Sequence, residues 1–146
     1  MRIRPVALVP VVLAYSLLGV GACGQSQKAD TDKFEGAEKD VAEAVFEFRD
    51  AVAKRDEGKI CDTYLTSALK EEVTTKGKAA GRGSTCAKAI EDSIADIDAT
   101  DIEVTDITIE GTTAIAKIKT DLSRGNDPTD ALTLANEKGW RISKLP

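Results

Sequence analysis

The sequence predicts an α+β domain, in which helices from the first half of the chain cover one face of an antiparallel sheet formed by the second half. Two observations lead to this prediction. Between residues 37 and 97, apolar residues recur every three or four positions, which is the period of an amphipathic helix. Between residues 102 and 145 they alternate with polar residues, as in strands that bury one face. A helical half followed by a sheet is an α+β arrangement.

The first predicted helix runs from about Ala37 to Arg55. One of its faces is apolar at spacings of four, three and four residues, through Val41, Val45, Phe48 and Val52. A second aromatic residue, Phe46, falls well round the helix from this face. We expect the helix to be covered by its neighbours on two sides, rather than to present Phe46 to a partner.

Shorter helical stretches follow. Residues 60–65 form a second apolar face, and Thr66-Ser67 begins another turn or two that reaches Val73. The glycines and basic residues between Thr74 and Thr85 predict a flexible surface loop, because they lack the residue order and preceding strand of a phosphate-binding P-loop. Ser84 or Thr85 then caps a helix that we expect to run from Cys86 to about Ile97.

Four strands complete the predicted domain. Ile102 and Val104 alternate with polar residues, but Ile107 and Ile109 do so one step out of phase, which predicts a bulge near Asp106. Turns are expected at residues 110–111 and 137–139, and a loop at residues 123–129. Together these signals predict an antiparallel meander, whose later strands are centred on residues 114–118, 132–134 and 140–145.

The start of the chain has the features of an export signal. Arg2 and Arg4 precede an apolar run over residues 6–20, and small residues follow it. The stretch Val20-Gly21-Ala22-Cys23 resembles the lipobox of bacterial lipoproteins. This resemblance implies a diacylglyceryl group on Cys23, cleavage between Ala22 and Cys23, and a mature protein anchored on the outer side of the cell membrane.

Two alternatives remain for this stretch. A spanning anchor needs about 20 apolar residues, whereas the run before Cys23 is shorter and interrupted, for example by Pro10 and Gly19. A removable signal without lipid is the other alternative. We divide the chain into a signal peptide (1–22), a polar tether (23–36) and one domain (37–146).

Charge and cysteine content narrow the classes of function. The net charge is −5, and it becomes more negative when the two arginines leave with the signal, which argues against a nucleic-acid partner. With Cys23 assigned to lipid, Cys61 and Cys86 remain, and in an oxidising compartment we expect them to form a disulfide.

We expect neither a metal nor a cofactor. The chain has no histidine, and two cysteines alone do not make a tetrahedral zinc site. Asp96, Asp98 and Asp101 form an acidic cluster, but the glycine and the closing glutamate of a calcium loop are missing from it. We interpret the cluster as a solvated turn.

The order of elements resembles the nuclear transport factor 2-like superfamily. The likeness covers about Glu38 to Leu145 and is carried by four stretches: Ala44–Asp56, Ile60-Cys61-Asp62-Thr63-Tyr64-Leu65, Ser84-Thr85-Cys86, and Leu132 through Trp140 to Ile142. It implies that the helices pack on a curved sheet in a cone-like domain. A cystatin-like arrangement of one helix on a sheet is the alternative fold.

The same superfamily contains ketosteroid isomerases and polyketide cyclases. Such chemistry needs a carboxylate base and a neutral donor such as tyrosine in a dry cavity. Tyr64 is the only tyrosine after the signal, and Glu43, Glu47 and Asp50 lie on the polar side of the first helix. The absence of histidine excludes the usual Ser–His and Cys–His nucleophiles. We therefore expect no catalysis, with a small-molecule isomerase or cyclase as the alternative.

The expected function is a binding or interaction module in the cell envelope, in one of two forms. In the first, a cavity lined by Phe48, Tyr64 and Trp140 holds a small apolar ligand. In the second, the sheet or the basic segment at residues 76–82 docks an envelope protein. Core packing is the simpler interpretation of the three aromatic residues. An open apolar cavity would favour a ligand, and an exposed apolar patch a protein partner.

Overall fold

The computed structural model describes residues 31–94, 102–120 and 129–146. Helices occupy the first of these ranges and four antiparallel strands the other two, so the predicted α+β class is confirmed. The signal peptide, Cys23, most of the tether, the acidic cluster at residues 96–101 and the predicted loop at residues 123–128 lie outside the described residues.

The longest helix, α1 (Gly36–Ala53), agrees closely with the helix expected over residues 37–55. A short turn, α2 (Glu57–Lys59), begins where the Asp56 side chain accepts a hydrogen bond from the Lys59 backbone N–H at 3.0 Å. It continues into one turn of π-helix, η1 (Ile60–Tyr64). The predicted second apolar face is therefore helical, and its Ile60, Cys61 and Tyr64 side chains are buried.

The next helix, α3 (Ser67–Ala79), is longer than predicted. The Thr66 hydroxyl caps it by accepting a hydrogen bond from the Leu69 N–H at 3.2 Å. The prediction of a loop from Thr74 onward is wrong for the residues up to Ala79, because Gly77 serves close packing there rather than a turn. The hairpin partner, α4 (Cys86–Ile94), begins at the predicted residue.

The sheet is a meander with strand order β1-β2-β3-β4. Its strands are β1 (Ile102–Glu110), β2 (Thr113–Thr120), β3 (Thr129–Asn136) and β4 (Trp140–Lys144). The pairing of β1 with β2 shifts register between Val104 and Asp106. The bulge predicted from the change of phase is therefore confirmed, and it keeps both Val104 and Ile107 buried.

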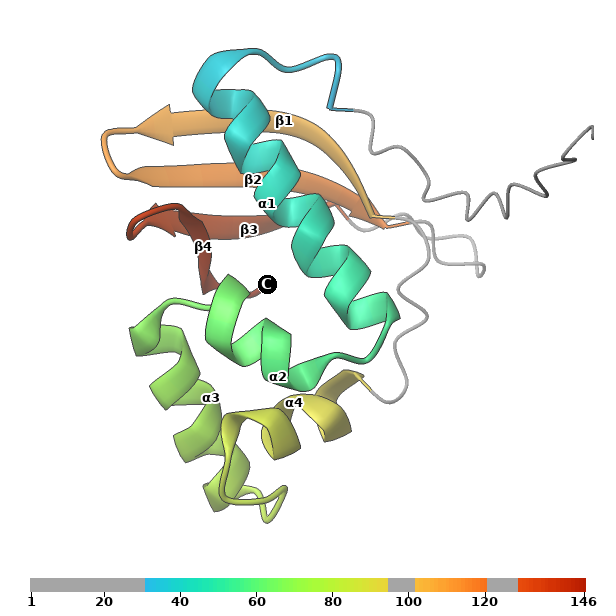
Figure 1. Cartoon of the computed structure of the whole chain (residues 1–146), viewed down its shortest axis with the longest axis vertical. Coiled ribbons are helices and arrows are strands. Elements are labelled where there is room, and N and C mark those ends of the chain that lie inside the picture. Colours follow the sequence, from blue (N-terminus) through green and yellow to red (C-terminus); the bar gives the residue numbers. More distant parts are fainter. Residues whose placement is uncertain (1–30, 95–101, 121–128) are drawn as a thin grey trace, which may run out of the picture.

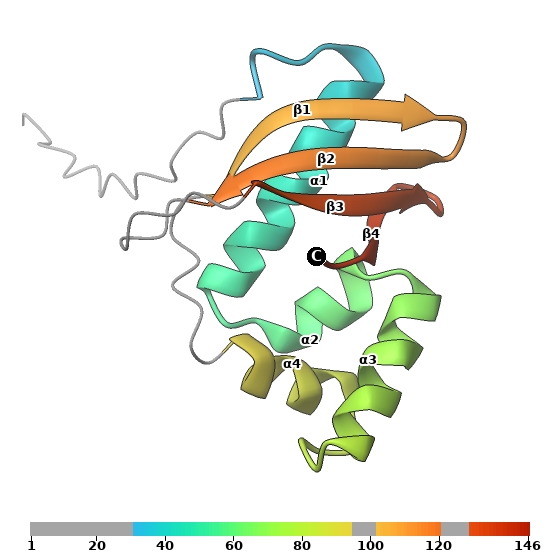
Figure 2. The same ribbon diagram turned by 180° about the vertical axis from the view of Figure 1, so that it is seen from behind.

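The elements form two groups (Figures 1 and 2). Helix α1 crosses one face of the sheet, whereas α2, η1, α3 and α4 form a second group beyond one edge of it, in which η1 and α3 contact β4. Residues Leu65 and Thr66 attach this second group to the sheet, since Leu65 forms a parallel bridge with Ile142 and the Thr66 N–H donates to the Ile142 carbonyl at 2.9 Å. Of the described helices, α1 is thus the one that covers the sheet face as predicted.

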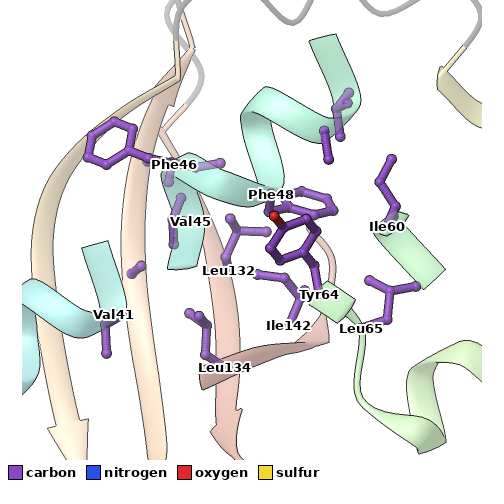
Figure 3. Packing of buried hydrophobic residues seen from close by; sticks show 14 of the residues in the cluster. Val41, Val45, Phe46, Phe48, Ile60, Tyr64, Leu65, Leu132, Leu134 and Ile142 are labelled. Atoms are coloured by element: carbon purple, nitrogen blue, oxygen red, sulfur yellow. The ribbon is translucent and has the colours of Figure 1, made fainter. Parts of the chain in front are cut away.

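The core lies between α1, η1 and the sheet (Figure 3). Its fully buried side chains include Val41 and Val45 of α1, as the helical period predicts. Phe46 is also buried, on another side of the helix, and the Arg49 guanidinium lies over its ring at 4.9 Å from the centroid. This confirms that α1 is covered on two sides.

Candidate functional site

The three aromatic residues expected to line one cavity are found in different environments. Phe48 and Tyr64 are both buried in the core cluster (Figure 3). Trp140 is half-buried at the start of β4. Trp140 and Tyr64 border two separate surface depressions, and Phe48 lines neither of them. Phe48 and Tyr64 are therefore core residues, whereas Trp140 borders a polar surface depression.

The depression beside Trp140 has a volume of about 370 Å³ and lies between α1 and the β3–β4 turn. Its helical wall consists of Asp40, Glu43, Ala44 and Glu47, and Asn136, Gly139 and Trp140 line the other side. The three carboxylates share one face of α1, since they stand three and four residues apart. The result is an open acidic surface rather than an apolar cavity.

The depression beside Tyr64 is smaller, at about 130 Å³. Glu47, Asp50 and Asp56 line it together with two lysines. One of these, Lys59, has its ammonium 5.5 Å from the centroid of the Tyr64 ring. Hydrogen bonding and charge interaction with Tyr64 raise the pKa of Lys59 above its ordinary value of 10.5. This surface is polar and too small for a drug-sized molecule, for which pockets of about 300 Å³ or more are typical.

A third depression lies between α3 and α4, with a volume of about 360 Å³. Most of its lining residues are small, and two basic residues, Lys76 and Arg82, line it as well. We call it the α3–α4 groove. Its remaining lining residues are Val73, Gly77, Ala80, Ala89 and Ser93. Sequence reasoning missed this groove because it placed residues 74–79 in a loop.

Glycine at position 77 allows α3 and α4 to approach this closely. A Cβ atom added at Gly77 would lie 3.4 Å from the Ala89 Cα and well within 3.0 Å of the Ala89 Cβ. The chain then turns at Gly83, whose φ of 103° favours glycine. In the sequence, the glycines of this segment look like loop residues, so the contact between the two helices is visible only in the structure.

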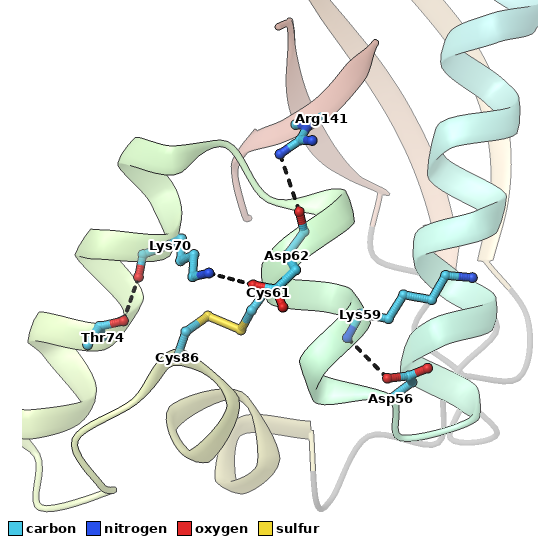
Figure 4. A network of polar contacts seen from close by, with 8 residues as sticks. All are labelled: Asp56, Lys59, Cys61, Asp62, Lys70, Thr74, Cys86 and Arg141. Atoms are coloured by element: carbon cyan, nitrogen blue, oxygen red, sulfur yellow. Dashed lines mark hydrogen bonds and ion pairs between the residues drawn. A yellow bond between two sulfur atoms is a disulfide. The ribbon is translucent and has the colours of Figure 1, made fainter. Parts of the chain in front are cut away.

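The predicted disulfide joins Cys61 of η1 to Cys86 at the start of α4, with 6.1 Å between their Cα atoms (Figure 4). Polar contacts surround it. Asp62 forms an ion pair with Lys70 of α3, and its backbone carbonyl accepts a hydrogen bond from Arg141 of β4 at 3.4 Å. The disulfide and the Asp62–Lys70 ion pair therefore link the helical hairpin to η1, and the hydrogen bond from Arg141 links η1 to β4.

The residues considered for catalysis do not form a buried acid–base pair. Glu43 and Glu47 are exposed and Asp50 is half-buried. Among the described residues, the one buried charged side chain is Arg49, whose Nε and Nη2 atoms donate to Asp50 Oδ1 at 3.2 and 2.9 Å. None of the three carboxylates is therefore enclosed in the kind of dry cavity that an isomerase or cyclase needs.

The described residues contain neither a cluster of metal ligands nor a helix that could span a membrane. Within residues 31–94, 102–120 and 129–146, no three carboxylate or cysteine side chains gather in a way that would hold a metal ion. None of the helices in these ranges combines the length and apolarity needed to cross a bilayer. The acidic cluster of Asp96, Asp98 and Asp101 lies outside these ranges.

Comparisons with known protein families, curated proteins and solved structures found no match to this chain. Its function must therefore be argued from its own residues.

Proposed function

We propose that this chain is an exported bacterial lipoprotein, held on the outer side of the cell membrane by lipid on Cys23. The observation that carries the proposal is the Cys61–Cys86 disulfide. It uses both cysteines other than Cys23, and disulfides persist mainly in exported proteins. The lipobox-like stretch that ends at Cys23 then accounts for the third cysteine.

We further propose that residues 37–146 form a nuclear transport factor 2-like domain of cone-like shape. The position of α1 across a four-stranded antiparallel meander supports this assignment. The shorter helices α2, η1, α3 and α4 also support it, because in the sequence they follow α1 and precede the four strands. The cone shape itself is part of the proposal.

The domain acts as a binding or interaction module without catalysis. Charged residues contribute to all three depressions described above. Two of the three aromatic residues expected around an apolar ligand are instead buried in the core. These observations favour a polar or charged partner in the envelope over a small apolar ligand. They also give no support to an isomerase or cyclase, whose substrate needs a dry cavity.

Lipid attachment can be tested by growing producing cells with a labelled fatty acid. We expect the wild-type protein to carry the label and to sediment with membranes. Cys23→Ser should lose the label and remain unprocessed, whereas Ser26→Ala in the tether should behave like the wild type. An unlabelled wild-type protein, or a Cys23→Ser protein that keeps the label, would contradict the proposal.

A further inference from the structure

The end of the α3–α4 hairpin differs in charge from the rest of the chain. Residues 76–88 contain four basic residues and no acid, although the whole chain has a net charge of −5. We call this segment the basic tip. Its charged residues are Lys76, Lys78, Arg82 and Lys88.

The basic tip has a defined backbone conformation. The Arg82 N–H donates to the Gly77 carbonyl at 2.8 Å and thereby closes the turn that follows α3. The close contact of Gly77 with Ala89 fixes the spacing of the two helices, and the disulfide at Cys86 attaches the start of α4 to η1. The charged side chains are thus carried by a preorganised support, which lowers the entropic cost of binding a ligand.

Two of these cations border the α3–α4 groove, which has the size of a ligand site. Lys76 pairs with Glu72 at 2.6 Å, but both side chains are more than half exposed, so the pair contributes little and can exchange for an external anion. Within the described residues, Arg82 has no ion pair. Its planar guanidinium suits two-pronged contact with phosphate oxygens.

The basic tip lies at the end of the molecule opposite to the start of the described chain (Figures 1 and 2). Residues Thr31–Glu35 run beside β1, where Lys33 pairs with Glu103 at 3.3 Å and Phe34 is buried. A tether that enters beside β1 therefore places the tip at the far end of the domain. Under the proposed function, the basic tip is at the opposite end of the domain from the point where the tether joins it (Figures 1 and 2).

We propose that the basic tip docks a phosphate-bearing polymer of the cell envelope, with phosphate groups seated in the α3–α4 groove between Lys76 and Arg82. This inference rests on the proposed function for the location of the polymer, but not for the binding itself. Four cations along one hairpin match charges repeated along a polymer, and the two that pair with carboxylates, Lys76 with Glu72 and Lys88 with Glu91, do so at exposed sites where the pairs can exchange. The acidic remainder of the chain repels polyanions, so the tip is where such a polymer approaches. The position of the tip favours a polymer beyond the membrane over the anchoring lipids.

The test measures binding of the full chain, kept in a non-ionic detergent, to inorganic polyphosphate over a range of salt concentrations. We expect Lys76→Ala/Arg82→Ala to weaken binding at low salt about tenfold. Two lost phosphate contacts should also reduce the slope of log affinity against log salt by about 1.4, if each contributes about 0.7 as on single-stranded nucleic acids. The control Lys54→Ala/Lys144→Ala removes two exposed lysines outside the tip and should leave binding unchanged.

Two other anionic ligands show whether the tip prefers a phosphate polymer to a carboxylate polymer or to a lipid membrane. Polyglutamate and vesicles of anionic phospholipid should bind more weakly than polyphosphate. Equal binding to polyglutamate, stronger binding to the vesicles, or equal losses in the tip and control variants would overturn the proposal. Thermal unfolding of both double variants should match the wild type and show that the fold is intact. Because polyphosphate binding does not require lipid on Cys23, failure here and failure of the labelling test are distinguishable.

Discussion

Replacing Gly77 with alanine tests the packing that forms the helical hairpin. In an exposed helix this change stabilises a protein, because glycine is about 1 kcal/mol less favourable than alanine. At Gly77 the new methyl group would lie within 3.0 Å of the Ala89 Cβ, whereas non-bonded carbon atoms prefer about 3.5–4.0 Å. Overpacking of this kind costs about 1–3 kcal/mol. The overpacking outweighs the gain in helix propensity, so we expect Gly77→Ala to lower the free energy of unfolding by about 1 kcal/mol.

Urea unfolding of the full chain in detergent, followed by circular dichroism, measures this loss. Gly58→Ala is the matched control, because the nearest atom to its new Cβ would be 3.9 Å away, so no loss is expected there. Adding Ala89→Gly to Gly77→Ala removes the clash, and a double-mutant cycle should show favourable coupling of the two changes. A Gly77→Ala protein as stable as Gly58→Ala would refute the close approach of α3 and α4.

Two further predictions concern covalent and ionic links. Replacing Cys61 and Cys86 with serine opens a loop of 25 residues and should lower the free energy of unfolding by about 3–4 kcal/mol, as measured in urea; an unchanged midpoint would show that the bond does not stabilise the fold. The hydrogen bond and charge of Lys117 lower the pKa of Asp106 below its ordinary value of 3.8, so this pair stabilises the fold above that pH and its contribution is lost as pH falls through the lowered pKa. In Lys117→Ala the Asp106 carboxyl should titrate at a higher pH by NMR, and an unshifted titration would contradict the pairing.

Local sequence patterns predicted those helices and strands in which buried residues recur at a regular spacing. The faces of α1 and the bulge near Asp106 both follow from the rule that apolar side chains must reach one core. The pairing of Cys61 with Cys86 followed from counting cysteines once Cys23 was assigned to lipid. The sequence also placed the start of α4 correctly, at Cys86.

The candidate site was harder to predict, because it depends on distances between elements. Gly77 resembles a loop residue in the sequence, and its role becomes clear only when Ala89 lies against it. For the same reason residues 74–79 appeared to be a loop, and the groove beside them was missed. Phe48 and Trp140 are of the residue type that often lines a ligand cavity. In the structure, however, Phe48 of α1 is buried in the core, whereas Trp140 of β4 borders a surface depression.

The intact mass of the protein extracted from the membranes of its own host is the most direct test of the proposed lipoprotein. The proposal predicts a chain that begins at Cys23, carries a diacylglyceryl group and is two hydrogen atoms lighter than its reduced form. A chain that keeps residues 1–22, or one that begins at Cys23 without lipid, would contradict it.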